Sequence, residues 1–180
     1  MSQLTLILGG ARSGKSSHAL WLAKESRKPV TFIATAQAFD EEMSARIQKH
    51  KAERPVNWQT LELPLNIVPG VSQIKSDVVI LDCITLWITN LMMQFVKDDF
   101  VDEVPFTQTA QAETEALLTS LRNTEREWLI VSNEVGLGLV PPYQMGRVYR
   151  DALGWVNQRL AQEADAVILM VAGIPMMDKG

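Results

Sequence analysis

The feature that most constrains the fold is a glycine-rich run of eight residues near the N-terminus. The run is Gly9-Gly10-Ala11-Arg12-Ser13-Gly14-Lys15-Ser16, and it matches the pattern G-x-x-x-x-G-K-[ST]. The apolar residues 4–8 before it are typical of a strand buried on both faces, and apolar residues at helical spacing follow it to about Arg27. Strand, loop and helix in this order predict a phosphate-binding loop. The alternative, a chance glycine-rich turn, does not account for a match across this eight-residue pattern in this context.

Each part of this loop has a distinct predicted task. The glycines let the loop close around phosphates, and backbone N–H groups at the start of the helix supply positive potential. Lys15 is expected to reach the β- and γ-phosphates, while the Ser16 hydroxyl ligates Mg²⁺. Asp82, which closes the apolar run 77–82, is the predicted second metal residue. Asp82 could instead cap the following helix, but an acid at the carboxyl end of a buried strand favours the metal role.

The rest of the chain alternates short apolar runs with helical segments. Predicted strands cover residues 30–33, 58–63, 77–82, 128–132 and 166–171, and predicted helices cover 40–54, 84–97, 107–126 and 144–163. Residue Asp40 is the expected N-cap of the first of these helices. Residues 64–76 have no clear period, and the acidic stretch 98–105 is expected to be an exposed connection. The alternation predicts an α/β fold with a parallel sheet, in one domain that spans residues 1–180.

Composition narrows the class of protein further. Hydrophobic residues make up 47% and charged residues 21% of the chain, as in soluble globular proteins. The net charge of -4 supplies no cationic field, so nucleic acid is not an expected partner. No signal peptide is expected, and the longest apolar stretch, 83–96, is too short and too polar to span a bilayer. The single cysteine, Cys83, is predicted to be a buried structural thiol in a cytoplasmic protein.

The predicted helix 40–54 carries an unusual face for a structural helix. At helical spacing this face combines apolar residues with one imidazole and two guanidinium groups: Met43, Arg46, Ile47, His50 and Arg54. A neutral imidazole can attack an α-phosphorus, and Arg46, Lys51 or Arg54 could then neutralise phosphate charge. Taken alone, a histidine near basic residues is more often structural, which is also how we interpret His18.

Six further stretches share a pattern with one known family. Together with the phosphate loop they extend over almost the whole chain, and they resemble the bifunctional adenosylcobinamide kinase/adenosylcobinamide-phosphate guanylyltransferases of cobalamin biosynthesis. The stretches are Ile33-Ala34-Thr35-Ala36, Arg46-Ile47-Gln48-Lys49-His50-Lys51, Asp82-Cys83-Ile84-Thr85-Leu86-Trp87, Asn133-Glu134-Val135-Gly136, Arg150-Asp151 and Asn157-Gln158-Arg159-Leu160-Ala161.

The resemblance implies a fold, an activity and an assembly. The implied fold is a three-layer, RecA-like P-loop fold, and the implied assembly is a homotrimer. The implied enzyme phosphorylates adenosylcobinamide with ATP or GTP, with Lys15 as a catalytic residue. A histidine then takes GMP from GTP, releases pyrophosphate and passes GMP to adenosylcobinamide phosphate, giving adenosylcobinamide-GDP.

The resemblance also implies site residues. Some members carry two adjacent histidines where this chain has Lys49-His50, so His50 is the position that fits the guanylylated residue. The general base for the corrinoid hydroxyl stays open between carboxylates that include Glu134 and Asp82. The implied nucleotide contacts are Gly9 to Ser16, Ala34, Thr35, Ala36, Lys51, Ala52, Glu53, Arg54, Glu62 and Asp82.

Two other functions would keep the phosphate loop and Asp82. A P-loop kinase for another small metabolite would use ATP without needing His50, and a nucleotide-dependent switch or assembly ATPase would have no small-molecule acceptor. Replacement of His50 distinguishes the first alternative from the bifunctional enzyme.

Overall fold

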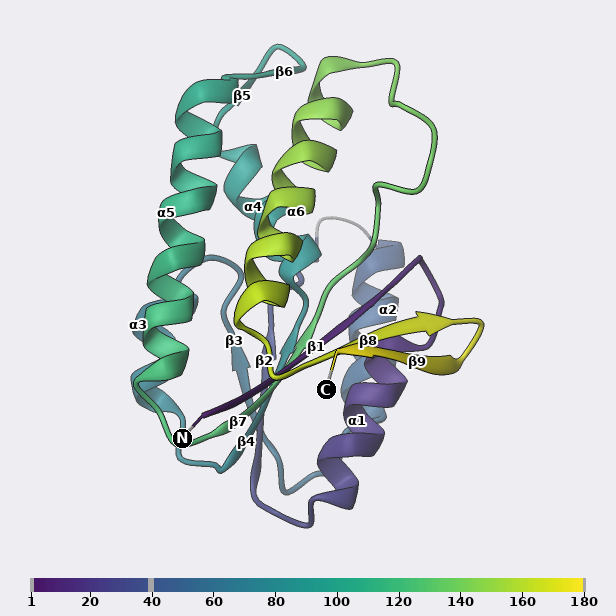
Figure 1. Ribbon diagram of the computed structural model, residues 1–180, viewed down its shortest axis with the longest axis vertical. Coiled ribbons are helices and arrows are strands. Elements are labelled where there is room, and N and C mark those ends of the chain that lie inside the picture. The colour runs from purple at the N-terminus through teal and green to yellow at the C-terminus, as the bar shows by residue number, and fades with distance from the viewer. Residues whose placement is uncertain (1, 39–40, 180) are drawn as a thin grey trace.

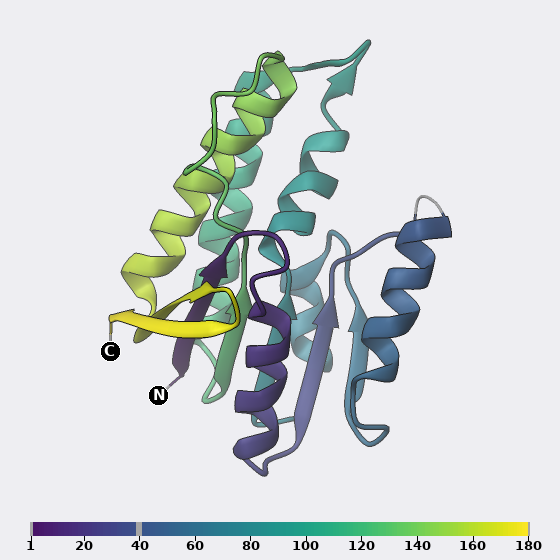
Figure 2. The same cartoon turned by 90° about the vertical axis from the view of Figure 1, so that its right-hand side faces the viewer.

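The protein forms one mostly parallel sheet covered by helices on both faces (Figures 1 and 2). The computed structural model describes residues 2–38 and 41–179, and of these the side chains of residues 42, 43, 46, 49 and 178 are not described. The seven strands follow the order β3-β2-β4-β7-β1-β8-β9, and every neighbouring pair is parallel except β8 with β9. The strands are β1 (Gln3–Gly9), β2 (Val30–Ala34), β3 (Gln59–Glu62), β4 (Val78–Asp82), β7 (Glu127–Val131), β8 (Ala166–Val171) and β9 (Ile174–Lys179).

The two faces of the sheet carry separate apolar cores. On one face, α1 (Lys15–Glu25) packs Ala19, Leu20 and Ala23 against the strands, and α2 (Glu41–Ala52) lies on the same side. The other face is covered by α3 (Ile67–Gly70), the short 3₁₀ helix η1 (Val71–Gln73), α4 (Ile84–Met93), α5 (Glu103–Arg122) and α6 (Gln144–Glu163). The central strands are apolar on both faces because both faces are buried, which is the usual condition of a parallel sheet.

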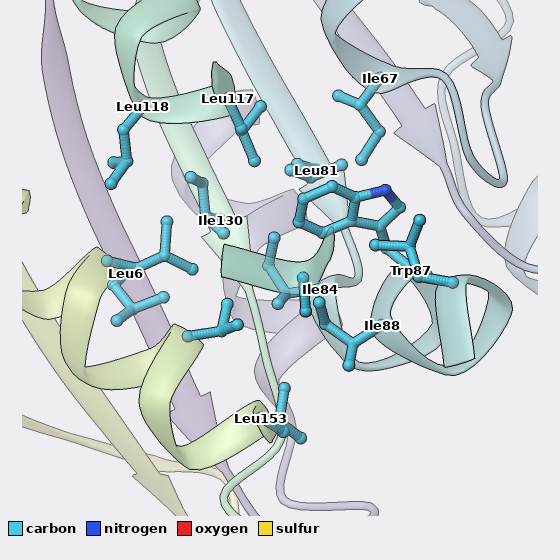
Figure 3. Close-up of a cluster of buried hydrophobic side chains, with 14 of the residues drawn as sticks. Leu6, Ile67, Leu81, Ile84, Trp87, Ile88, Leu117, Leu118, Ile130 and Leu153 are labelled. Carbon is cyan, nitrogen blue, oxygen red and sulfur yellow. The ribbon is translucent and has the colours of Figure 1, made fainter. Parts of the chain in front are cut away.

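Trp87 of α4 lies within the larger core (Figure 3). Its side chain is fully buried among Leu81, Ile84 and Ile67, and its indole Nε1 donates a 3.0 Å hydrogen bond to the Leu65 carbonyl oxygen. The indole N–H is thereby satisfied inside an apolar cluster, where an unpaired donor would destabilise the fold.

The predicted α/β class and the strands and helices that flank the phosphate loop are confirmed, but the prediction for residues 84–126 was wrong in detail. Helix α4 ends at Met93, and the hairpin β5 (Val96–Lys97) and β6 (Phe100–Val101) follows it. Asp98 and Asp99, with φ of 48° and 64°, form the turn that links its strands. Helix α5 begins at Glu103, four residues before the predicted start, because a proline in the first helical turn, here Pro105, loses no helical hydrogen bond.

The C-terminal strand β9 was not predicted. Ala172 and Gly173, with φ of 50° and 83°, reverse the chain so that β9 pairs antiparallel with β8. Pro175 is tolerated because β9 is the edge of the sheet, where one side of the strand needs no ladder partner. The predicted N-cap Asp40 lies outside the described residues. Among the residues that are described, no helix is long and apolar enough to cross a membrane.

Candidate active site

The register of the sheet brings the carboxyl ends of five strands into one row. Ala34 on β2 pairs with Glu62 on β3 and with Asp82 on β4, and Asp82 pairs with Val131 on β7. Val131 in turn pairs with Ile7 of β1, two residues before Gly9. Because these strands are parallel, residues far apart in the sequence meet at one edge. This edge brings the phosphate loop together with Ala34, Glu62 and Asp82, three of the nucleotide contacts that the family resemblance implies.

The phosphate loop depends on two glycines for its shape. Gly9 has a φ of 151°, and a Cβ added there would lie 2.5 Å from the Met170 carbonyl oxygen. Gly14 has a φ of 96° at the start of α1, and an added Cβ would lie 3.2 Å from the Cα of Gly173. At Gly10, by contrast, an added Cβ would meet nothing within 4 Å. The loop therefore needs glycine at positions 9 and 14, where the backbone conformation and close neighbours exclude a side chain.

Lys15 lies inside the loop rather than in solvent. Its side chain is buried, and Nζ donates to the Gly10 carbonyl oxygen at 2.7 Å, with the Ser13 Oγ at 3.5 Å. In the described part of the chain no side chain caps the N-terminus of α1, and the first turn of this helix contains no acidic residue. The ammonium group and the first-turn N–H groups of α1 thus make the loop an anion site.

Ser16, the last residue of this loop, lies beside Asp82 at the end of β4. The Ser16 side chain forms a hydrogen bond with the Asp82 carboxyl. Burial raises the pKa of Asp82 above its usual range, and the bond to Ser16 and the charges of His50, Arg54 and Lys15 only partly oppose that effect. A hydroxyl and a carboxylate side by side are ligands that suit Mg²⁺. Within residues 2–38 and 41–179, no cluster of three or more His, Cys, Asp or Glu side chains could hold a metal by itself. A metal here would therefore take its remaining ligands from phosphate oxygens and water.

Thr35 fixes the backbone on which Asp82 sits. Its Oγ1 donates to the Cys83 carbonyl oxygen at 2.7 Å and accepts from the Cys83 N–H at 2.8 Å. The side-chain amide of Asn90 binds the Thr35 carbonyl oxygen at 2.8 Å. Burial and the neighbouring Asp82 raise the pKa of the Cys83 thiol to about 12, so Cys83 stays protonated. Cys83 was predicted to be buried, but its side chain is half-buried.

Helix α2 places His50 near the same edge. The His50 Nδ1 lies 3.4 Å from Glu53 Oε2, and the imidazole is 38% exposed. A carboxylate beside Nδ1 favours the tautomer with hydrogen on Nδ1, which leaves the Nε2 lone pair for another atom. Lys51 on the same helix forms an ion pair with Glu62. Four other residues that were predicted to contact the nucleotide are exposed. They are Ala52 and Glu53 at the end of α2, and Ala11 and Arg12 in the phosphate loop.

Arg54 follows α2 and has unsatisfied donors. Its guanidinium carbon lies 3.5 Å from the ring centroid of Phe32, and its Nε and Nη1 are buried without a hydrogen-bond partner in the described part of the chain. Burial lowers the pKa of Arg54, and the charges of Asp82, Glu62 and Glu53 oppose that effect. Two buried N–H donors without an acceptor favour an anionic or carbonyl-bearing ligand at this position.

The other shared motifs hold the phosphate loop to the sheet. Asn157 accepts from the Ser132 hydroxyl at 2.7 Å and donates to the Asn133 carbonyl oxygen at 3.0 Å. The Asn133 N–H donates to Thr85 Oγ1 at 2.7 Å, and the Glu134 N–H donates to the Gly9 carbonyl oxygen at 3.0 Å. Sequence reasoning had not assigned roles to Thr85 or Asn157, because nothing in their spacing reveals a link between a helix and the loop after β7.

Known proteins resemble this chain in sequence and in fold. Residues 5–177 match the CobU family, described as cobinamide kinase/cobinamide phosphate guanyltransferase. The bifunctional adenosylcobalamin biosynthesis protein CobP of Pseudomonas aeruginosa is 44% identical, over 97% of this chain and 96% of the relative. The corresponding CobU proteins of Escherichia coli K12 and Salmonella typhimurium LT2 are both 39% identical, over 95% of this chain and 97% of theirs.

Solved structures share the fold at much lower identity. The protein PH0250 of Pyrococcus horikoshii OT3 aligns with a TM-score of 0.55 at 10% identity, over 99% of this chain and 86% of its own. The RadB recombinase aligns with a TM-score of 0.51 at 12% identity, over 93% of this chain and 73% of its own. These likenesses confirm the three-layer, RecA-like P-loop fold. With the phosphate loop, the histidine helix and a full-length sequence match in agreement, the chain belongs to the cobinamide kinase/cobinamide phosphate guanyltransferase family of transferases.

Proposed function

We propose that this chain catalyses two successive transfers at the edge of the sheet described above. It first phosphorylates the aminopropanol hydroxyl of adenosylcobinamide with ATP or GTP. It then transfers GMP from GTP, through guanylylated His50, to adenosylcobinamide phosphate, and releases adenosylcobinamide-GDP and pyrophosphate. The observation that carries the proposal is the position of His50, which lies close enough to Asp82 to interact with it, while Asp82 is bonded to Ser16 of the phosphate loop.

In the kinase reaction, the loop binds and orients the nucleotide. Lys15 and the first N–H groups of α1 would contact the β- and γ-phosphates, where negative charge develops during transfer. Ser16 and Asp82 would hold Mg²⁺, which neutralises phosphate charge when bound. Thr35 keeps Asp82 in place through Cys83. The chain thus contributes position and charge rather than a covalent intermediate in this step.

In the guanylyl transfer, the His50 Nε2 lone pair attacks the α-phosphorus of GTP. An N–P bond forms, the bond to the bridging oxygen breaks, and pyrophosphate leaves with the electron pair. Glu53 beside Nδ1 stabilises the positive charge that the imidazole gains. Arg54 and Lys51 would contact the nucleotide, since the buried N–H groups of Arg54 need an acceptor. The acceptor phosphate then displaces His50 and takes the GMP group.

The remaining proposals concern assembly and location. A homotrimer follows the family resemblance, as do the nucleotide contacts assigned to residues 9–16, 34–36 and 51–54, and to Glu62 and Asp82. A cytoplasmic location follows from the single cysteine and the sequence pattern at the N-terminus. Sedimentation of the purified protein would test the trimer, and removal of Mg²⁺ with a chelator should stop both transfers. Conversely, a monomer with full activity would contradict the proposed assembly.

The experiment that tests the covalent step uses GTP labelled at the α-phosphate. Wild-type protein, with Mg²⁺ and without corrinoid, should acquire label that is labile in acid and stable in base, as a phosphoramidate is. The chain has two histidines, so His18→Ala is the matched control for His50→Ala. His18 stacks on Trp21 with ring centroids 5.5 Å apart and takes no part in the proposed reaction.

The two variants decide between the functions considered. Label that persists in His18→Ala and disappears in His50→Ala establishes His50 as the guanylylated residue. Absence of label on folded wild-type protein that binds GTP would refute the second activity and leave a kinase.

A further inference from the structure

We propose that Glu134 is the general base of the kinase reaction, the group that takes the proton from the acceptor hydroxyl. This inference rests on the proposed function and adds a catalytic residue to it. The acceptor is an alcohol, and its oxygen becomes a better nucleophile as its proton is removed. A base for this purpose must lie at the edge that binds the γ-phosphate and must have a free oxygen.

The backbone position of Glu134 meets the first condition. Strand β7 lies between β4, which ends at Asp82, and β1, which leads into the phosphate loop, so Glu134 follows β7 at the same edge of the sheet. The Glu134 N–H donates to the Gly9 carbonyl oxygen at 3.0 Å, which ties this residue directly to the first residue of the loop. Asn133 beside it is held by Thr85 and Asn157. The position of Glu134 is therefore set by several contacts.

The side chain meets the second condition. Oε1 of Glu134 accepts a hydrogen bond of 2.5 Å from the Gly136 N–H, which fixes the orientation of the carboxylate. No described residue donates a hydrogen bond to Oε2 or forms an ion pair with this side chain. One oxygen thus anchors the group while the other is available to accept a proton.

The other carboxylates of this edge already have partners. Asp82 is hydrogen-bonded to Ser16 and interacts with the charge of Lys15, and this environment suits a carboxylate that binds a metal. Glu62 is paired with Lys51, and Glu53 lies beside His50. Among the described residues at this edge, Glu134 is the carboxylate without a cationic partner. The contacts favour it over Asp82 as the proton acceptor.

In the proposed step, proton transfer to Glu134 accompanies phosphoryl transfer to the acceptor oxygen. The hydroxyl O–H bond breaks and its proton moves to Glu134, while the oxygen forms a bond to the γ-phosphorus. The bond between that phosphorus and the β,γ-bridging oxygen breaks, and the nucleoside diphosphate leaves with the electron pair. In the guanylyl transfer the acceptor is an ionised phosphate, which has no such proton to lose. Glu134 is therefore needed for the first transfer and not for the second.

Glu134→Gln tests this difference in one protein. The glutamine carbonyl oxygen still accepts from Gly136, so the local structure is retained while the base is removed. With adenosylcobinamide and ATP, we expect kcat to fall at least 100-fold, as is usual for loss of a general base, and KM to stay within about twofold. With adenosylcobinamide phosphate and GTP, we expect guanylyl transfer to stay within about twofold of wild type.

Two further variants sharpen the result. Glu134→Asp retains a carboxylate and should recover part of the kinase rate. Glu25→Gln is the matched control, since it removes an exposed carboxylate at the far end of α1 and should leave both transfers unchanged.

Several outcomes would overturn the inference. A Glu134→Gln enzyme with a near-normal kinase rate shows that Glu134 is not the base. Equal losses in both transfers show that the residue only holds the loop in place. A wild-type protein that cannot phosphorylate adenosylcobinamide refutes the proposed function itself, which separates that failure from the failure of this inference.

Discussion

Replacement of Thr35 by valine tests how the site is held together. Valine has nearly the same shape as threonine, but it cannot replace either hydrogen bond between the Thr35 hydroxyl and Cys83. Thr35 is fully buried, so water cannot take the place of its hydroxyl as the partner of the Cys83 N–H and carbonyl groups. Each lost bond that leaves a buried partner costs about 1 to 2 kcal/mol. We expect Thr35→Val to lower the free energy of unfolding by about 2 to 4 kcal/mol.

Urea denaturation followed by tryptophan fluorescence measures this loss. With a slope near 2 kcal/mol per molar urea, the midpoint should fall by about 1 to 2 M. Thr35→Ser is the matched control, because it keeps the hydroxyl and removes one methyl group, at a cost of about 1 kcal/mol. A valine variant within about 0.5 kcal/mol of wild type, or a serine variant as unstable as the valine variant, would refute the reasoning.

Three further predictions concern the loop, the thiol and the guanidinium group. Gly9→Ala should weaken nucleotide binding at least tenfold, because its Cβ would lie 2.5 Å from the Met170 carbonyl oxygen; Gly10→Ala, with nothing within 4 Å, should bind normally in the same fluorescent-nucleotide titration. Burial raises the pKa of Cys83 from 9.0 to about 12, so above pH 9 the unfolded chain loses this proton first and stability falls as pH rises toward 12. Cys83→Ala should make that alkaline loss less steep in unfolding measured from pH 8 to 11, and an unchanged slope would contradict it. Arg54→Met keeps an unbranched side chain beside Phe32 and removes two buried donors that have no partner in the described part of the chain. The KM for GTP should rise about tenfold, because these donors would no longer bind the nucleotide. The free energy of unfolding without nucleotide should stay equal or increase.

Local patterns in the sequence were sufficient to predict the centre of the fold. The phosphate loop, the strand before it and the helix after it were all predicted, because glycine at positions 9 and 14 and a period of apolar residues are local signals. The parallel sheet was likewise predicted from short apolar runs that alternate with helical segments. The turn at Asp98 and Asp99 was missed, since two acidic residues with positive φ have no strong sequence signature.

The edge strand β9 was missed for a related reason. Its residues Ile174, Met176 and Met177 do not alternate with polar residues, and they are exposed. A strand at an edge forms because the neighbouring strand has unpaired N–H and C=O groups. The position of those groups depends on the whole sheet. Such a strand is therefore determined by its partner β8 more than by its own sequence.

The sequence alone determined the kind of chemistry, whereas the tertiary structure decided which side chains share it. A glycine-rich loop with Lys15 and Ser16 specifies phosphate binding wherever it occurs after a strand. The partners of that loop come from other strands. Asp82 is hydrogen-bonded to Ser16, Glu134 to Gly9 and Thr35 to Cys83. These contacts form because parallel strands end at one edge of the sheet. Strand order and register determine which of these residues come into contact. Both result from the packing of the whole sheet between its helices rather than from any local run of residues.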